Sequence, residues 1–332
     1  MRPLCCDAQN VPGIALKYKA LCCGPVPSED ARQPLTLERA VVSLLLRQEP
    51  TPANRRMLSE SAPFRVGPTS DGKMRLALDD IRSGLFGTGV WLHLAWHEIR
   101  MRYKRSVIGP FWITISTGVM VGALGPLYGT LLNQDLSTYF QHLAISMILW
   151  AFLSGSVNES CTAFIVASGF IKEIRLPLSV HVLRVLAKNA IMFLHNCVII
   201  FLVLIVFPPS DARMLFLAIP GLILLIGNLM WIGLGIALLS ARFRDIPQIV
   251  GNVLQVAFFV TPIVWKREML GDNSYVTLLN PLFHLINVVQ APLLGQRPLL
   301  ISWVACACML LVGGGLVIWM FARYRNRVAY WI

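Results

Sequence analysis

The chain has 332 residues, of which 56% are hydrophobic and only 14% are charged, and its mean hydropathy is +0.64. A soluble protein keeps about a quarter of its residues charged, so this balance excludes an ordinary soluble domain and is typical of a membrane protein. The formal net charge is +12; residues 1–84 carry twelve basic against nine acidic side chains, and the rest carry seventeen against eight. Since the excess lies mostly among the apolar segments, we expect lipid headgroups, and not nucleic acid, to balance it.

Residues 1–84 differ in composition from the rest of the chain. They are rich in Pro, Arg, Ser and Glu, and their one apolar patch, at 40–46, is far too short to cross a membrane. The amino terminus also lacks the apolar region of a signal peptide. We expect a weakly ordered cytosolic extension. The alternative is upstream sequence translated only in a predicted reading frame, with Met57 or Met74 as the true start.

Residues 85–108 are predicted to form an amphipathic helix that lies in the membrane interface. Leu92, Trp96, Ile99 and Tyr103 recur at spacings of three and four residues, which places them on one helix face. The basic cluster at the end of this segment stands next to the first apolar run, where it would anchor the helix to the headgroups.

Residues 109–332 form the predicted transmembrane domain. A helix needs about 20 apolar residues to cross a bilayer. Six segments fit this length approximately: 111–132, 142–167, 185–207, 214–240, 248–265 and 299–321. The fifth is short for a full span, and its TPIVW sequence could end a helix or begin a re-entrant turn. The sequence therefore predicts an all-α integral membrane protein with six transmembrane helices.

The connections between these segments predict the orientation. Thirteen Lys and Arg lie before the first span, after the second and fourth spans, and after the sixth, whereas the three alternating loops hold only four. Lys and Arg accumulate in cytosolic loops. Both termini are therefore predicted to be cytosolic.

Motifs for catalysis or metal binding are incomplete. Residues 67–74, GPTSDGKM, begin like a phosphate-binding loop but end in Met74, where a Ser or Thr must hold magnesium. His97 and Glu98 begin like a zinc-protease motif, but Met101 replaces its second His. The vicinal cysteine pairs near the amino terminus do not have the spacing of zinc ligands. The sequence thus predicts neither an enzyme nor a metal site.

Glu159 stands out among the polar residues of the predicted spans. A carboxylate at membrane depth costs about 3 kcal/mol or more, so it faces a partner or a cavity. One interpretation is a hydrogen bond between helices, to a residue such as Asn189 or His195. The other is a polar contact near the cytosolic mouth of a transport path. In both cases Glu159 points away from lipid.

Four stretches together resemble one family. They are RYKRSVIGPFW (102–112), SGFIKEIRLPLSVHVLRVLAKN (168–189), ARFRDIPQIVGNVLQVAFFVTPIVW (241–265) and NPLFHLINVVQAPLLG (280–295). They resemble the membrane subunits of type-2 ABC exporters, specifically the branch that exports polysaccharides such as O antigen and capsule. The resemblance covers about residues 90–332.

The resemblance implies that two copies of this subunit form a homodimeric pore in the bacterial inner membrane, with two copies of a separate ATPase beneath it. ATP and magnesium would be bound by that ATPase, and this chain would hold no cofactor of its own. In the family, the interfacial helix and the loop after the second span meet the ATPase. Carried onto this chain, the ATPase-coupling candidates are Arg100, Arg102, Lys104, Arg105, Lys172, Glu173, Arg175 and Pro177, with Arg242, Arg244 and Asp245 in a second cytosolic loop. For Arg100 and Lys104, lipid anchoring alone is the alternative.

The implied cargo is a lipid-linked polysaccharide. Sugars carry hydroxyls and also apolar faces that stack on aromatic rings, so the pore should mix aromatic and polar side chains. The pore candidates are Tyr128, Tyr139, Trp150, Phe152, Asn158 and Glu159. Residues 266–298 are similar to the family's short outward-facing helices, which makes Asn280, Pro281 and Gly295 candidates for an exit gate. The alternative for this segment is a loop partly buried at the membrane surface.

Other functions stay open at this point. Within the family, the cargo could be a small lipid or a drug. A proton-coupled secondary carrier would use Glu159 as its relay, but it predicts inverted repeats, and the sequence has no convincing one. An enzyme of the envelope pathway would need a catalytic set that the sequence does not offer.

Overall fold

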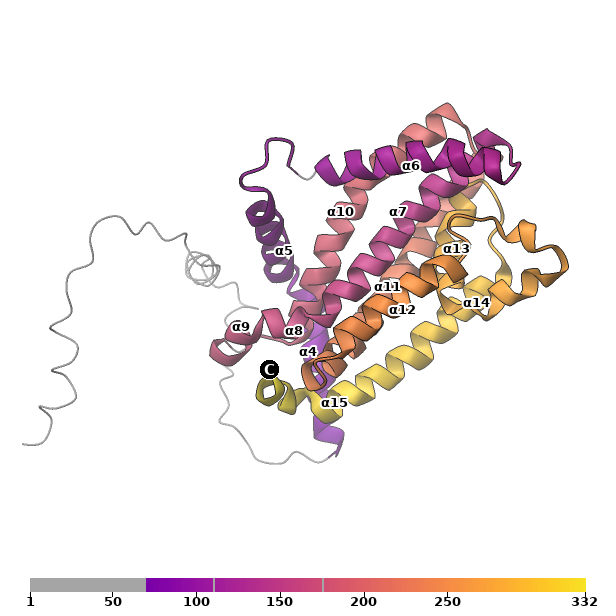
Figure 1. Ribbon diagram of the computed structural model, residues 1–332. Coiled ribbons are helices and arrows are strands. Elements are labelled where there is room, and N and C mark those ends of the chain that lie inside the picture. The colour runs from indigo at the N-terminus through magenta and orange to yellow at the C-terminus, as the bar shows by residue number, and fades with distance from the viewer. Residues whose placement is uncertain (1–69, 110, 175) are drawn as a thin grey trace, which may run out of the picture. The chain divides into compact units, whose positions relative to one another are not determined.

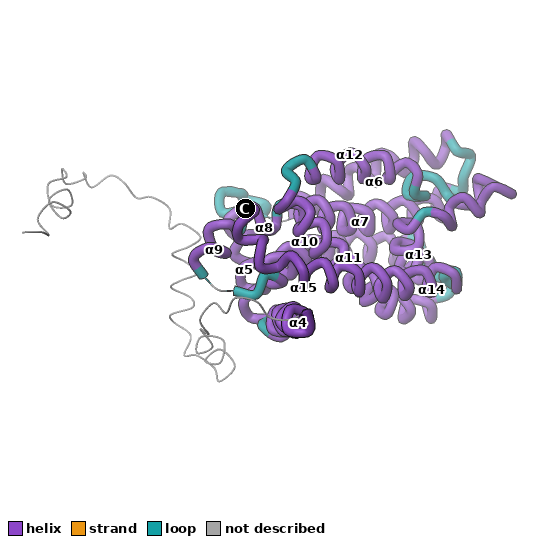
Figure 2. The backbone as a smooth tube through the Cα atoms, turned by 90° about the horizontal axis from the view of Figure 1, so that it is seen from below, coloured by secondary structure: helices purple, strands orange, loops and turns teal. Residues whose placement is uncertain are grey.

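The computed structural model describes residues 70–109, 111–174 and 176–332, and within these ranges all regular structure is helical (Figures 1 and 2). The elements are α4 (Ser70–Phe86), α5 (Thr88–Tyr103), α6 (Phe111–Leu131), α7 (Leu136–Cys161), α8 (Ala163–Val166), α9 (Ser168–Glu173), α10 (Ser179–Val206), η1 (Ala212–Leu217), α11 (Ala218–Arg242), α12 (Ile246–Val260), η2 (Arg267–Leu279), α13 (Pro281–Leu293), α14 (Leu300–Cys308), η3 (Met309–Gly313) and α15 (Gly314–Trp331). Residues 1–69 of the expected extension lie outside the described residues.

The predicted all-α membrane class is confirmed. Five helical segments are long and apolar enough to span a membrane: Phe111–Leu131, Leu136–Cys161, Ser179–Val206, Ala212–Arg242 and Leu300–Trp331. They match the first four predicted spans and the last. A sixth arises if the pair Asn273–Leu279 and Pro281–Leu293, bent by 101°, counts as one span. The protein is therefore a multi-pass membrane protein; the side on which its termini lie stays a prediction.

The predicted fifth span is shorter than expected. It is α12, whose 15 residues rise about 22 Å, whereas the hydrocarbon core of a bilayer is about 30 Å thick. The helix stops at Val260 because Pro262 follows, and a proline disfavours helical backbone in the residue before it. Thr261 is accordingly extended. The chain then leaves the span through η2, where Gly271 takes a positive φ of 52° that glycine adopts without strain.

Helix α13 turns back into the protein. The side-chain oxygen of Asn280 caps its first turn, and Pro281 occupies the first helical position, where the missing N–H costs nothing. The helix lies so close to α11 that a side chain on Gly221 would collide with the carbonyl oxygen of Val288. After α13 the chain turns at Gly295, with φ of 73°. Asn280, Pro281 and Gly295 thus delimit a buried re-entrant helix; their role as an exit gate stays a prediction.

Helix α7 is the centre of the bundle. It packs against α6, α10, α11, α12 and α13 (Figure 1). Most of its side chains are buried, and Leu143, Leu149 and Leu153 join a core shared with Leu225 of α11 and Leu285 of α13. Residues near the two ends of α7 are therefore held in place by several helices at once.

Helix α4 occupies part of the segment that was expected to be weakly ordered. It spans Ser70–Phe86, and α5 follows after Gly87, so residues 70–84 are helical and the expected single helix 85–108 is shorter and begins at residue 88. The Asp80 carboxylate, 1% exposed, accepts hydrogen bonds from the backbone N–H groups of Leu178 and Ser179, both 3.1 Å long. These contacts fix α4 to the beginning of α10.

Candidate functional site

Five charged side chains from α5, α7 and α10 meet where α5 packs against α10. We call Glu98, Arg102, Glu159, Arg184 and Lys188 the charge cluster. Lys188 lies between the two carboxylates, with its Nζ 2.5 Å from Oε1 of Glu98 and 2.8 Å from Oε2 of Glu159. Arg184 Nη1 lies 3.5 Å from Glu98 Oε2, and Arg102 Nη2 lies 3.6 Å from Glu159 Oε1. The cluster therefore joins α5 to two spans.

Helical spacing explains why these groups converge. Arg184 and Lys188 are four residues apart on α10, and Glu98 and Arg102 are four apart on α5, so each pair lies on one helix face. The side chains of Arg184 and Lys188 are only 9% and 6% exposed. A buried charge is tolerated only when it is paired. Because two of its three cations, Arg184 and Lys188, are buried on a span, the cluster holds α5 against the bundle more strongly than surface ion pairs would.

The position of Glu159 decides between two interpretations of this residue. Asn189 Nδ2 donates a hydrogen bond of 2.7 Å to Glu159 Oε2, which confirms the predicted bond between helices. His195, the other named partner, instead contacts the Ile191 carbonyl oxygen and the ring of Phe111. Glu159 therefore joins α7 to α10, and through Arg102 it also reaches α5.

The pKa of Glu98 gives the charge cluster a dependence on pH. Burial raises this pKa, but the hydrogen bond from Lys188 and three nearby positive charges outweigh burial and hold the pKa below its ordinary value of 4.5. A carboxyl whose pKa is lowered by folding stabilises the fold above the ordinary pKa. This contribution is lost as the pH falls through the folded-state value.

We therefore expect the midpoint of thermal unfolding to fall as the pH drops below about 5, and to fall less steeply in Glu98→Gln, which has no carboxylate to protonate. The measurement is a thermal melt of the purified protein at several pH values. Parallel pH profiles for the two proteins would show that Glu98 does not contribute.

The coupling candidates gather at one end of the described residues, together with α9 and the carboxyl terminus (Figure 1). We call this the basic end. Most of these side chains are exposed: Arg100, Arg102, Lys104, Arg105, Lys172, Glu173, Arg242, Arg244 and Asp245. Pro177 is partly buried before α10, and Arg175 lies outside the described residues. The structure thus brings three separate segments of the chain to one surface.

Two contacts tie these segments to the carboxyl terminus. Lys172 Nζ donates a hydrogen bond of 2.7 Å to the carbonyl oxygen of Ile332. The guanidinium of Arg242 lies 5.7 Å from the ring centroid of Trp331 and 5.5 Å from that of Phe243, within cation–π range. The short helix α9 and the α11–α12 turn therefore both rest on the end of α15.

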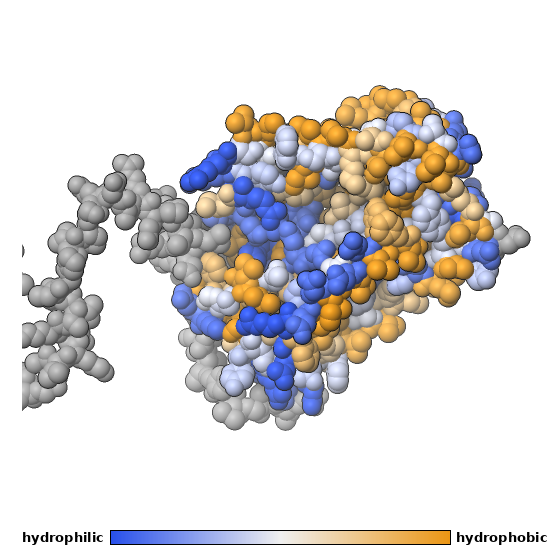
Figure 3. All heavy atoms as spheres, in the orientation of Figure 1, coloured by the Kyte–Doolittle hydropathy of each residue, from blue (hydrophilic) through white to orange (hydrophobic). Residues whose placement is uncertain are grey.

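A row of amides runs along α12. Gln248, Asn252 and Gln255 are exposed and follow each other at spacings of four and three residues, so they share one helix face. We call them the amide row. Asn158 of α7 is also exposed and lies beside α12, near Gly251. Hydrophilic residues indeed form a strip between α7 and α12 that continues from the basic end (Figure 3). Exposed amides on a membrane-spanning helix do not face lipid without a large penalty.

The aromatic pore candidates are placed differently from the expectation. Tyr139, Trp150 and Phe152 are buried in the core of the bundle, and the Tyr139 hydroxyl donates to the carbonyl oxygen of Val264. Tyr128 is partly buried against the same core. Tyr139, Trp150 and Phe152 therefore pack helices together within the subunit, and Tyr128 is the ring among the four that stays partly exposed. Among the other candidates, Asn158 is exposed and Glu159 is half-buried in the charge cluster.

Comparison with known proteins decides the family. The family described as ABC-2 type transporter matches residues 90–294, which is more than half of the chain. This chain belongs to the ABC-2 type transporter family. As a member, it is the membrane subunit of a transporter, not an enzyme, and it works with an ABC ATPase subunit.

Individual ABC-2 type relatives are similar over most of their own length. The O-antigen export system permease protein RfbA of Myxococcus xanthus is 23% identical over 210 residues, which are 61% of this chain and 79% of the relative. Two proteins of Klebsiella pneumoniae with the same description are 24% and 22% identical over 193 residues, which are 57% of this chain and 74% of each relative.

Sequence reasoning on this ABC-2 type subunit missed the charge cluster and the amide row as units. Lys188 was counted only as a loop cation, and Glu98 only as part of a failed zinc motif. The spacing of Gln248, Asn252 and Gln255 on an apolar helix was the signal that could have revealed the amide row. For the charge cluster, the signal was that Glu98 and Arg102, and likewise Arg184 and Lys188, are four residues apart and so share a helix face.

Proposed function

We propose that this subunit forms, as a homodimer in the bacterial inner membrane, the path by which a lipid-linked polysaccharide is exported. Two ABC ATPase subunits would bind at the basic end, which would then face the cytosol, and would supply ATP and Mg²⁺; this chain would need no cofactor. The descriptions of the relatives as O-antigen export permeases support this class of cargo.

The observation that carries the proposal is the amide row. Apolar side chains would contact an apolar cargo such as a drug. A sugar chain instead needs hydrogen-bond donors and acceptors along its path. Each amide of Gln248, Asn252 and Gln255 offers both. The row faces away from the buried side of α12, which carries Leu254, so it would meet either the cargo or a second copy of the subunit across the pore.

Glu159 supports the exporter over a proton-coupled carrier. A relay must pass a proton along a path, whereas the Glu159 carboxylate is held by contacts to Lys188 and Asn189 of α10. A role in linking α7 to α10 and α5 therefore fits its contacts better than proton relay.

The proposal predicts that Asn252→Leu combined with Gln255→Leu reduces export. The variant loses two hydrogen bonds to the cargo, of about 1 kcal/mol each, which should slow passage of the polysaccharide by a factor of about ten or more. Surface polysaccharide would be measured by immunoblot in cells whose own permease gene has been deleted, and the tagged subunit would be co-purified with the ATPase encoded beside it. We expect the variant to keep the ATPase and to lose most of the surface polysaccharide.

Val253→Leu combined with Val256→Leu is the matched control, because these exposed residues lie on the neighbouring apolar face of the same helix. It should leave export unchanged. Normal surface polysaccharide in the amide variant would show that the row does not line the path. Failure of the wild-type subunit to co-purify with any ATPase would reject the proposed assembly.

A further inference from the structure

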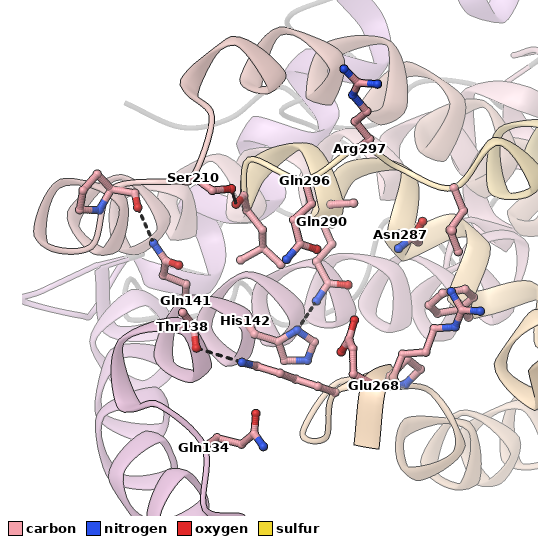
Figure 4. A pocket seen from close by; sticks show the side chains of 18 residues that line it. Gln134, Thr138, Gln141, His142, Ser210, Glu268, Asn287, Gln290, Gln296 and Arg297 are labelled. Atoms are coloured by element: carbon pink, nitrogen blue, oxygen red, sulfur yellow. Dashed lines mark hydrogen bonds between the residues drawn. The ribbon is translucent and has the colours of Figure 1, made fainter. Parts of the chain in front are cut away.

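A polar cavity of about 560 Å³ lies at the end of the molecule opposite the basic end (Figure 4). Its walls come from the start of α7, the chain after α10, the segment around η2, and α13 with the turn that follows it. The volume is in the range of small-molecule sites, about 300–1,000 Å³. Such sites are usually lined by apolar side chains, whereas this one has five amide side chains: Gln134, Gln141, Asn287, Gln290 and Gln296. The cavity therefore suits a ligand rich in hydroxyl groups.

Hydrogen bonds fix the orientation of the buried groups in this cavity. The Ser146 hydroxyl donates to the carbonyl oxygen of His142, so its oxygen accepts the bond of 2.6 Å from Gln290 Nε2. The second hydrogen of that amide nitrogen points to His142 Nδ1, 3.0 Å away, which must then accept. The proton of the neutral His142 ring is consequently on Nε2.

Two buried atoms in the cavity wall have no hydrogen-bond partner among the described residues. One is Nε2 of His142, a residue that is 8% exposed, and the other is Oδ1 of Asn287. The first is a donor by the argument above, and the second is an acceptor. A buried polar atom without a partner costs about 1–3 kcal/mol, so a ligand group that reached either atom would recover that cost.

The charges around the cavity favour an acidic ligand. Lys266, Arg267 and Arg297 line it, against the single carboxylate of Glu268. Lys266 donates to the Thr138 hydroxyl, and Arg267 lies over the Phe283 ring, 6.0 Å from its centroid. Burial lowers the pKa of Lys266 and outweighs the carboxylates of Glu268 and Asp135, which raise it.

We propose that this cavity binds one saccharide unit that carries a carboxylate. His142 Nε2 donates to a sugar hydroxyl, Asn287 Oδ1 accepts from another, and Arg297 pairs with the carboxylate. Phe283 and the proline and leucine side chains of the wall meet the apolar face of the ring. This inference rests on the proposed export of a polysaccharide, and it makes the cavity a holding site for the chain where it leaves the path.

The test is saturation-transfer NMR on the detergent-solubilised subunit with its ATPase, using glucuronic acid and glucose as probes. We expect glucuronic acid to bind at least about tenfold more tightly than glucose, as one charge-assisted hydrogen bond implies. Arg297→Ala should abolish this difference. Arg213→Ala is the matched control, since this exposed arginine lies in η1 outside the cavity, and it should keep the difference. Asn287→Leu should weaken both sugars.

Three outcomes would overturn the proposal: no transfer to either sugar, equal binding of the two, or the same loss in Arg213→Ala as in Arg297→Ala. The binding test does not depend on transport. If glucuronic acid binds as expected while deletion of the permease gene leaves surface polysaccharide unchanged, the assignment of the cavity is supported and the proposed export function is rejected. If export is confirmed and neither sugar binds, only the cavity assignment falls.

Discussion

Replacing Lys188 with methionine is expected to cost about 3 kcal/mol of stability, because removal of one partner from a buried ion pair leaves uncompensated charge. Lys188 is the cation that contacts both carboxylates of the charge cluster, Glu98 and Glu159. Without it, two carboxylates from different helices face each other. Arg184 still reaches Glu98, and Arg102 still reaches Glu159, so the cost should lie near the lower end of the range for buried pairs, about 3–5 kcal/mol.

The measurement is the midpoint of thermal unfolding of the purified subunit, together with ATP hydrolysis by the complex. Arg102→Met is the matched control, because its side chain is 50% exposed and exposed pairs contribute at most about 1 kcal/mol. Lys188→Met combined with Glu159→Gln should recover part of the loss, since only one carboxylate then remains. Equal midpoints for Lys188→Met and Arg102→Met would mean that the cluster does not stabilise the fold.

The cluster also has a mechanical consequence under the proposed function. Helix α5 lies at the basic end, where the ATPase would push, and its carboxylate is bonded to cations on α10. A force on α5 is therefore passed to two spans through ion pairs instead of through lipid. We expect the complex that carries Lys188→Met to export less polysaccharide for each ATP that it hydrolyses.

Composition was sufficient to predict the class of the protein and five of its spans, since a long apolar run has few ways to satisfy its backbone except as a buried or membrane helix. The fifth segment was different because apolarity continues through Thr261 to Trp265, past the proline that ends α12. Hydropathy indicates which residues can lie in an apolar environment, but it does not indicate where a helix ends. Here Pro262 ends the helix.

The site was harder to predict because its groups come from distant parts of the chain. Glu159 could be recognised alone, since a carboxylate in an apolar run is conspicuous. Its partner Lys188 was not conspicuous, because a lysine between two spans reads as an ordinary loop cation. The aromatic pore candidates are ambiguous for another reason: Tyr139, Trp150 and Phe152 fit a sugar path chemically, but large rings also fill a helix core, and in this subunit they are buried.

Replacing Asp80 with asparagine is expected to destabilise the protein by about 3 kcal/mol. The first residues of α10 have no capping side chain of their own, and Asp80 supplies the cap from α4. The same carboxylate accepts from the Ser179 hydroxyl at 2.9 Å and pairs with Arg325 Nη2 at 2.9 Å. It therefore joins α4, α10 and α15 at one point, with its negative charge at the positive end of the α10 dipole.

Asparagine fits the same space but keeps only one acceptor oxygen and places an NH₂ group against backbone donors. A buried donor left unpaired costs about 1–3 kcal/mol. Loss of the negative charge also removes the ion pair with Arg325, which adds to this cost. The neighbouring Asp79 is exposed, so Asp79→Asn should change stability by less than about 0.5 kcal/mol and serves as the control. Thermal unfolding and limited digestion with trypsin at Lys73 and Arg75 of α4 would measure the effect.

We expect Asp80→Asn to expose these two cleavage sites before the rest of the subunit unfolds, because the buried Asp80 cap joins α4 to α10 at the point where Gly84 seats α4 directly on Ser179. Arg325→Met should show a smaller shift, since it removes the ion pair and leaves the cap intact. If digestion of Asp80→Asn follows the same time course as that of Asp79→Asn, α4 is held by its apolar contacts around Ala77 and not by the cap.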